Sequence, residues 1–146
     1  MRIISYFIKR SVKKVDSLVK ILPWKRALTD YDIRLIIRQT PMDKVFKGVF
    51  SRDELRTLKP SRGIECGVLN LSKKNEEGSH WTAWFKHPGN IVCYFDSFGD
   101  LGPPDELKTY LNGCNIYYNV ERAQELGTVI CGHLCICFLY LEYESV

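Results

Sequence analysis

The sequence predicts an α+β fold in which an apolar helix packs against a small, mainly antiparallel sheet. Two patterns indicate this class: segments in the middle of the chain alternate with a period of two, and residues 134–141 form a continuous apolar run near its end. That run has eight residues, whereas a membrane span needs roughly 20. With 146 residues, 45% of them hydrophobic, the chain is long enough for one domain with a core.

The strands are predicted from segments that are rich in aromatic and β-branched residues and bounded by turn-forming residues. They lie at residues 64–71, 81–85, 91–95 and 115–120. Residues 46–50 form a shorter extended piece, which leads to a local helix or turn at 51–55. The loop 86–90, with Pro-Gly at its tip, has the length of a hairpin connection, so the second and third strands should pair antiparallel.

Three helices are predicted in the body of the chain. Thr29 and Asp32 form a capping-box pattern for a helix that continues to Arg38. Residues 103–111 begin with two prolines and two acids, a pattern typical of a helix start. The apolar run near the end of the chain predicts a third helix, and Cys131 stands at its beginning.

Residues 1–28 are predicted to be a basic amphipathic extension of the domain. Apolar residues recur at helical spacing from Ile4 to Leu22, and Pro23 ends the pattern. Residues 1–26 carry eight Lys and Arg side chains against the single acid Asp16, a net charge of +7. Either this helix docks on the body with a solvated basic face, or it binds an anionic membrane or nucleic acid such as DNA.

The six cysteines are expected to be free thiols. Small disulfide frameworks are usually poor in core residues, and this chain is not. We therefore expect an intracellular, reducing compartment (nucleus, cytoplasm or virion). A monomer is also expected. The series Cys131, His133, Cys135 and Cys137 suggests a metal site, but its alternating spacing on a helix cannot bring four ligands to one ion. No metal and no cofactor are predicted.

Cys131 and three other residues form the candidate site. A helix N-terminus favours a thiolate, and a histidine with an orienting acid would complete a nucleophilic triad. If the hairpin turns about the proline of loop 86–90, residues whose numbers sum to 176 face each other, and His80 lies opposite Asp96. Gln124, seven residues before the cysteine, would supply a second donor for an oxyanion.

Most other polar and aromatic residues near these positions are predicted to have structural roles rather than catalytic ones. His87 is predicted to be exposed in the hairpin loop, and His133 to lie on the helix surface or to be a satisfied core group. Trp81 should be half-buried beside the histidine of the site, and Cys135 should pack beneath its cysteine. Asn70 is either an ordinary strand-end residue or part of the site lining.

Four stretches in this order resemble one protein family. They are ECGVLNL at 65–71, GSHWTAWF at 78–85, CYFDSFG at 93–99, and Gln124 followed after six residues by CGHLCICFL at 131–139. Together they are similar to the adenovirus endopeptidase (adenain) and the wider ubiquitin-like-protease superfamily of cysteine proteases. GVFSRDEL at 48–55 resembles the relatives encoded by Maverick/Polinton elements and adenovirus-like genomes. The resemblance covers about residues 29–141.

The resemblance implies a papain-like cysteine protease fold for residues 29–146. It implies that His80 is the base, Asp96 the orienting acid, Cys131 the nucleophile and Gln124 the oxyanion donor. The adenovirus enzyme has glutamate at the position of Asp96, whereas cellular ubiquitin-like proteases have aspartate there, as this chain does. The chain also ends soon after the nucleophile helix, where the adenovirus enzyme continues, so a C-terminally short domain is expected.

The expected function is a cysteine endopeptidase that processes viral or viral-like precursor proteins, such as capsid polypeptides, after a small residue such as glycine. Two alternatives stay open at this point. The first is an isopeptidase that removes ubiquitin-like modifiers. The second is a non-catalytic remnant that binds nucleic acid through basic residues 1–26.

Overall fold

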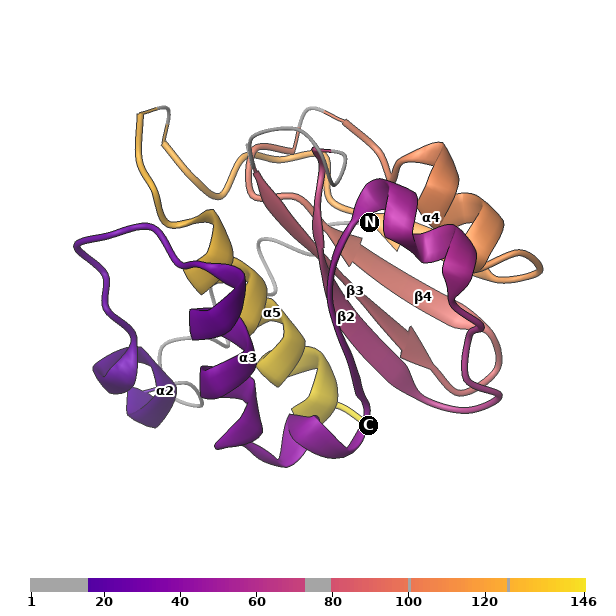
Figure 1. The fold of residues 1–146 in the computed structure, drawn as a ribbon, viewed down its shortest axis with the longest axis horizontal. Coiled ribbons are helices and arrows are strands. Elements are labelled where there is room, and N and C mark those ends of the chain that lie inside the picture. The colour runs from indigo at the N-terminus through magenta and orange to yellow at the C-terminus, as the bar shows by residue number, and fades with distance from the viewer. Residues whose placement is uncertain (1–15, 73–79, 100, 126) are drawn as a thin grey trace.

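The computed structural model describes residues 16–72, 80–99, 101–125 and 127–146, and Figure 1 shows their arrangement. A five-stranded sheet separates two groups of helices. The helices α2 (Asp16–Ile21), α3 (Asp30–Arg38) and α5 (Cys131–Glu144) lie on one side, and α4 (Asp105–Tyr110) lies on the other. The predicted α+β class, with the apolar helix packed on the sheet, is confirmed.

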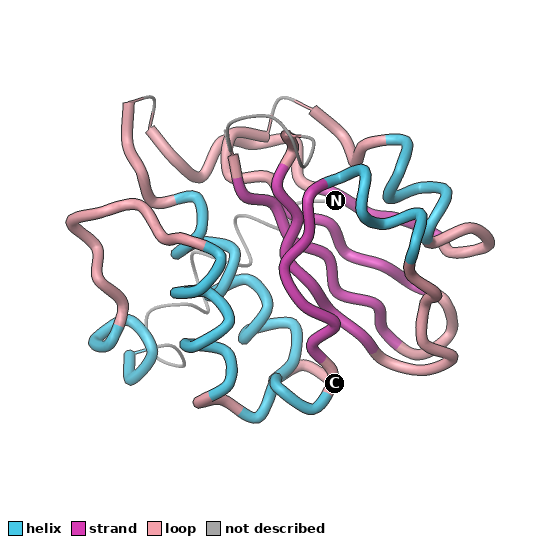
Figure 2. Tube along the Cα trace, viewed as in Figure 1, coloured by secondary structure: helices cyan, strands magenta, loops and turns pink. Residues whose placement is uncertain are grey.

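The sheet has the strand order β1-β2-β3-β4-β5. Its strands are β1 (Phe46–Ser51), β2 (Glu65–Asn70), β3 (Trp81–His87), β4 (Ile91–Phe95) and β5 (Asn115–Tyr118). The three central strands pair antiparallel, while both edge strands join in parallel. Figure 2 shows the strands together in one sheet. The predicted extended piece at 46–50 is a full strand of the sheet. Its alternation of apolar and polar residues is irregular because the pairing register shifts between Phe46 and Val49, where Gly48 has φ 137°.

The hairpin register differs from the predicted one by two residues. Paired residues have numbers that sum to 178, as in Ala83 with Phe95, so the predicted sum of 176 is wrong. The turn centres on Gly89 rather than on the proline before it, because Gly89 and Asn90 take the left-handed φ values of 80° and 59°. Strand β3 therefore continues to His87, and the prediction that His87 is exposed in the loop is wrong.

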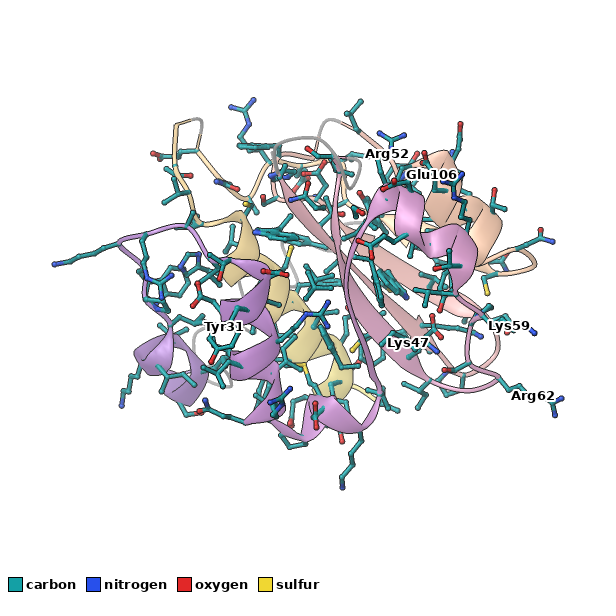
Figure 3. The ribbon with its side chains drawn as sticks, in the orientation of Figure 1. Tyr31, Lys47, Arg52, Lys59, Arg62 and Glu106 are labelled. Atoms are coloured by element: carbon teal, nitrogen blue, oxygen red, sulfur yellow. The ribbon has the colours of Figure 1, made fainter. Side chains whose placement is uncertain are left out.

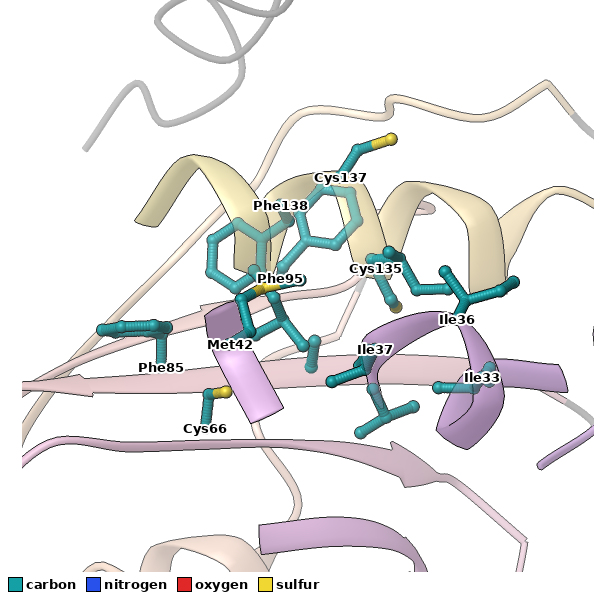
Figure 4. Packing of buried hydrophobic residues seen from close by; sticks show 14 of the residues in the cluster. Ile33, Ile36, Ile37, Met42, Cys66, Phe85, Phe95, Cys135, Cys137 and Phe138 are labelled. Atoms are coloured by element: carbon teal, nitrogen blue, oxygen red, sulfur yellow. The ribbon is translucent and has the colours of Figure 1, made fainter. Parts of the chain in front are cut away.

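The larger core lies between the sheet and the helices α3 and α5. The rings of Phe95 on β4 and Phe138 on α5 stack at a centroid distance of 5.1 Å, and Figure 4 shows them in the centre of this layer. Cys135 is fully buried in the same layer. Helix α5 thus presents a continuous apolar surface to the sheet, which fixes the position of its N-terminus.

The smaller core lies on the opposite face, beneath α4 and the 3-10 helix η2 (Arg52–Thr57). Trp84 fills this layer, and Gly67 makes room for it, because a Cβ atom at Gly67 would lie 2.2 Å from the indole ring. Arg52 and Glu106 join η2 to α4 through a bidentate ion pair with N–O distances of 3.2 and 3.1 Å (Figure 3). Strand β2, buried along its whole length, separates the two layers.

The described part of the N-terminal extension packs on the body. Leu18, Leu22 and Leu28 are buried in the larger core. His133 of α5 is buried, bonds through Nε2 to the carbonyl of Pro23 at 2.8 Å and stacks on Trp24. Its Nδ1 has no hydrogen-bond partner among the described residues, so the predicted core group is satisfied only in part. The docked alternative therefore describes residues 16–28, whereas most of the predicted helix lies outside the described residues. The domain boundary at residue 28 and DNA binding through residues 1–26 stay predictions.

Helix α3 begins with the predicted capping box. The Thr29 hydroxyl accepts from the Asp32 amide at 3.1 Å, and the Asp32 carboxylate accepts from the Thr29 amide at 2.9 Å. A hydrogen bond from Arg26 at 2.6 Å holds the pKa of the Asp32 carboxyl well below its usual range. Helix α4 occupies the predicted position. Among the described residues, no helix has both the length and the apolar character of a membrane span.

Candidate active site

Cys131 is the first residue of α5, as predicted. No side chain caps this helix start and no acid lies in its first turn, so the positive end of the helix faces the thiol. Gly132 allows the close approach of the surrounding chain, because a Cβ atom there would lie 3.1 Å from Trp81 and 3.2 Å from Leu28. The indole of Trp81 also donates to the Leu28 carbonyl at 2.9 Å.

His80 and Asp96 meet at the end of the sheet beside Cys131. His80 immediately precedes β3 and Asp96 immediately follows β4. In the observed register they are diagonal neighbours rather than directly opposed, and a shift of two residues keeps both side chains on the same face. His80 Nε2 and Asp96 Oδ1 lie 2.7 Å apart. The structure thus brings the two residues together although the predicted register is wrong.

The backbone around Asp96 is fixed by Asn119, a buried residue just after β5. Asn119 Oδ1 accepts from the Asp96 amide at 3.0 Å, and Asn119 Nδ2 donates to the Asp96 carbonyl at 2.5 Å. The Asp96 carboxylate also accepts from the Phe98 amide at 3.0 Å, and the Phe98 ring stacks on the His80 imidazole at 4.6 Å. Acid and imidazole are therefore both held in place before any substrate binds.

His80 and Cys131 form the electrostatic centre of the site. Burial alone would lower the pKa of His80, but hydrogen bonds with Asp96 and Cys131 outweigh it and raise this pKa to about 9. Burial alone would likewise raise the pKa of the Cys131 thiol, but its hydrogen bond with His80 leads the interactions that lower it below its ordinary value. Because Asp96 occupies Nε2, the ring presents Nδ1 to the thiol. Both shifts favour a thiolate–imidazolium pair.

Gln124 lies beside the thiol and is almost completely buried. Its Oε1 accepts from the Ser97 hydroxyl at 2.6 Å, and its Nε2 donates to the Thr128 carbonyl at 2.8 Å. The Thr128 carbonyl fixes the orientation of the amide, because only the NH₂ end can face an acceptor. An amide NH₂ group has two hydrogens, so Gln124 keeps one N–H beyond the bond to Thr128.

Three of the four predicted site residues, His80, Gln124 and Cys131, line one cleft, and Asp96 does not. Its lining consists of Ala27, Leu28, Asn70, His80, Trp81, Phe98, Gln124, Thr128, Val129 and Cys131. Asn70 thus belongs to the site lining, where its Oδ1 accepts from the Ser72 amide at 2.8 Å. Cys135, one helical turn after Cys131, is buried and donates to the Trp81 carbonyl at 3.4 Å. The described part of the cleft combines a thiol, an imidazole and an amide donor, which are the groups that acyl transfer requires.

Sequence reasoning missed the supporting residues Ser97, Phe98 and Asn119. The first two belong to the Asp-Ser-Phe-Gly motif, in which only the acid received a role. Asn119 had a usable signal, because neighbouring parallel strands end at the same edge of a sheet and Asp96 and Asn119 directly follow β4 and β5. That signal required knowing that β5 pairs with β4 in parallel.

The fold is shared with a viral protease of known structure. The pS273R protease of ASFV superposes with a TM-score of 0.58 at 15% sequence identity, over 86% of this chain and 62% of that protease. At this identity the match shows the fold alone. It agrees with the predicted protease fold for the chain.

Two adenovirus proteases are similar to the chain in sequence. The protease of Human adenovirus E serotype 4 is 30% identical over 71 residues, which are 48% of this chain and 35% of that protein. The protease of Bovine adenovirus 2 is 25% identical over 127 residues, 75% of this chain and 60% of that protein. The chain therefore spans less than two thirds of the length of either relative. No family model matches the chain. The resemblance to adenovirus proteases is confirmed.

Proposed function

We propose that the chain is a cysteine endopeptidase with Cys131 as its nucleophile. One observation carries this proposal: Cys131, His80 and Asp96 form a continuous hydrogen-bonded array at a helix N-terminus, beside the buried amide of Gln124. The similarity to adenovirus proteases and the fold shared with the ASFV protease support it.

In the first half of the reaction, the Cys131 thiolate attacks the carbonyl carbon of the scissile peptide bond and a C–S bond forms. The carbonyl oxygen becomes an oxyanion, which accepts hydrogen bonds from the Cys131 amide and from the remaining N–H of Gln124. Protonated His80 donates its Nδ1 proton to the leaving nitrogen as the C–N bond breaks. An amine leaves, and the acyl group stays on Cys131 as a thioester.

In the second half, neutral His80 removes a proton from water as the water oxygen attacks the thioester carbonyl. The same two donors hold the second oxyanion. The C–S bond then breaks, and the carboxylic acid product leaves with the Cys131 thiolate and protonated His80 restored. Asp96 remains ionised throughout and stabilises the charged ring.

The proposed substrates are viral or viral-like precursor polypeptides, including capsid precursors, cut after a small residue such as glycine. This part rests on the resemblance in motifs and on the names of the adenovirus relatives. A thiolate nucleophile requires a reduced cysteine, so we place the enzyme in a reducing intracellular compartment. All six cysteines are free thiols in the structure, in agreement with this proposal.

The test is cleavage of candidate precursor proteins by the purified chain and by its Cys131→Ala variant. We expect the variant to lose activity by roughly 10³-fold or more, because no other group replaces the nucleophile. Cys114→Ala is the matched control, since Cys114 is another partly exposed thiol and lies outside the cleft. Unchanged cleavage by Cys131→Ala would rule out the mechanism.

A second experiment separates endopeptidase from isopeptidase activity. A ubiquitin-like modifier that carries a C-terminal electrophile is incubated with the chain, and its covalent attachment to Cys131 is measured by mass spectrometry. An endopeptidase of the proposed type should not be labelled, while it should still cleave a precursor. Labelling by the modifier without precursor cleavage would favour the isopeptidase.

A further inference from the structure

We propose that His87, Cys93 and Glu142 form a metal-binding site for Zn²⁺ or a similar divalent transition metal, at the end of β3 remote from the candidate active site. A ring nitrogen of His87, Cys93 Sγ and a carboxylate oxygen of Glu142 all lie within 4.8 Å of one another. These three residue types supply nitrogen, sulfur and oxygen ligands to one point. The proposal is independent of the peptidase activity.

The distances among the ligand atoms suit a small ion after a minor adjustment. A tetrahedral zinc site has metal–ligand distances of about 2.0–2.3 Å, so its ligand atoms lie roughly 3.5 Å apart. His87 Nε2 and Glu142 Oε2 are 2.5 Å apart and would separate by roughly 1 Å to admit the ion. Rotation of the Glu142 carboxylate provides this movement without a change in the backbone.

The three ligands come from three different elements that already pack together. His87 ends β3, Cys93 lies in β4, and Glu142 lies in the last turn of α5. Residues 87 and 93 are diagonal neighbours on one face of the hairpin, since Phe85 pairs directly with Cys93. The Phe85 ring also contacts the His87 ring at a centroid distance of 4.7 Å, which restricts the imidazole.

The donor set favours zinc-like ions over magnesium and calcium. Imidazole and thiolate bind borderline and soft metals, whereas magnesium and calcium prefer oxygen ligands. A thiolate and a carboxylate together balance the charge of a divalent cation. The side chains of His87 and Glu142 are 18% and 17% exposed, so an ion can reach the site from solvent while the Cys93 thiol stays buried.

The test is titration with Co²⁺ and Zn²⁺ in the Cys131→Ala background, which removes the thiol of the candidate active site as a competing ligand. We expect about one equivalent of Co²⁺ to bind and to give a thiolate-to-cobalt charge-transfer band in the near ultraviolet. Zn²⁺ should displace Co²⁺ and raise the melting temperature. Absence of any bound equivalent at micromolar metal would overturn the proposal.

Two further variants identify the ligands in the same background. Cys93→Ala should abolish the charge-transfer band, while Cys114→Ala, the matched thiol control, should leave it unchanged. Glu142→Gln should weaken Co²⁺ binding by at least about tenfold and remain folded, because glutamine can still hydrogen-bond to His87. Unchanged Co²⁺ affinity in Glu142→Gln would overturn the assignment even if Cys93→Ala fails to fold.

Discussion

The two ends of strand β3 carry the same three kinds of side chain in different arrangements. One end holds His80, Asp96 and Cys131, and the other holds His87, Glu142 and Cys93. At the first end the histidine lies between the carboxylate and the thiol. At the second end the carboxylate of Glu142 contacts both the histidine and the thiol.

This difference in order gives the two thiols opposite character. Cys131 faces an imidazole that its acid partner keeps protonated, so the pKa of the Cys131 thiol falls below its ordinary value. Burial, and next the negative charge of Glu142, raise the pKa of the Cys93 thiol to about 12. Of the two thiols, Cys131 is therefore the one whose surroundings favour the thiolate, while Cys93 would need a metal ion to become one.

Helix α5 strengthens the contrast because it reaches both ends of the sheet. Cys131 lies at its N-terminus, where the helix dipole favours a negative charge. Glu142 lies in its last turn, where the dipole disfavours a negative charge and favours a cation nearby. The same helix thus favours a thiolate at its N-terminus and would favour the proposed cation at its C-terminus. The two thiols therefore differ in the order of their contacts and in the end of α5 that each lies beside.

The largest effect on the reactivity of the Cys131 thiol is expected when His80 is removed. His80→Ala should slow alkylation of Cys131 by iodoacetamide near pH 6.5 by about 100-fold, because the thiol loses the hydrogen bond that lowers its pKa. His87→Ala is the matched control and should leave the rate unchanged. Labelling at Cys131 is quantified by peptide mass spectrometry.

Equal rates in wild type and His80→Ala would show that the thiolate does not depend on the imidazole. The contrast between the two ends would then rest on the helix dipole alone. A slower rate in His87→Ala, at unchanged overall stability, would instead show that the two ends are coupled through β3.

The pH dependence of peptidase activity should follow the same pair. Activity requires a Cys131 thiolate and a protonated His80, so it should rise as Cys131 ionises and fall as pH increases through about 9, the pKa of His80. The histidine pKa is raised, so the stability that its hydrogen bonds contribute is fully present below pH 6.5 and is lost as pH increases through about 9.

Asp96→Asn tests the origin of that alkaline limb. Asp96 is the main group that raises the pKa of His80, so the limb of the rate–pH profile should move to lower pH. The maximal rate should also fall by roughly 100-fold or more. Asp105→Asn, a change to a highly exposed carboxylate, serves as the control. An alkaline limb unchanged in Asp96→Asn would contradict the assigned role of Asp96.

Most of the predicted elements are present, and the structure brings together the four residues that the sequence predicted for the candidate site. Helix α3 shows why: its capping box is a local signal, and the structure contains it. The hairpin register shows the limit, because the prediction placed the turn on the proline while the left-handed Gly89 and Asn90 set the pairing. His80 and Asp96 still lie close together, because side chains alternate between the two faces of a strand and a register error of two residues keeps both on the same face.

What the sequence could not show depends on contacts between distant elements. His87 looked like a loop residue because its partner Glu142 is 55 positions away. The alternating spacing of residues 131–137 suggested a metal site within one helix, whereas the proposed ligands His87, Cys93 and Glu142 come from two strands and a helix. Asn119 was missed for the same reason, since its role depends on the parallel pairing of the last strand.

A moderate effect is expected from Asn119→Ala. The change leaves the buried amide of Asp96 without its partner and removes one of two donors to the Asp96 carbonyl, which keeps the Gly99 amide, so we expect a loss of about 2 kcal/mol in the free energy of unfolding. The maximal rate should fall by roughly tenfold because Asp96 loses its support. Asn115→Ala, at an exposed position on β5, is the control for urea denaturation and for the rate–pH profile. A stability loss with an unchanged rate would assign Asn119 a structural role only.

The smallest expected effect is at the second end of β3 in the absence of metal. Glu142→Gln keeps the size of the side chain but removes the charge from its contact with His87. The free energy of unfolding, measured by urea denaturation in the presence of EDTA, should therefore fall by about 1 kcal/mol. His80 and Cys131 lie far along the same strand and helix, so alkylation of Cys131 should be unchanged. A rate change at Cys131 would show that Glu142 positions the whole of α5, and the two ends of β3 could then no longer be treated as separate sites.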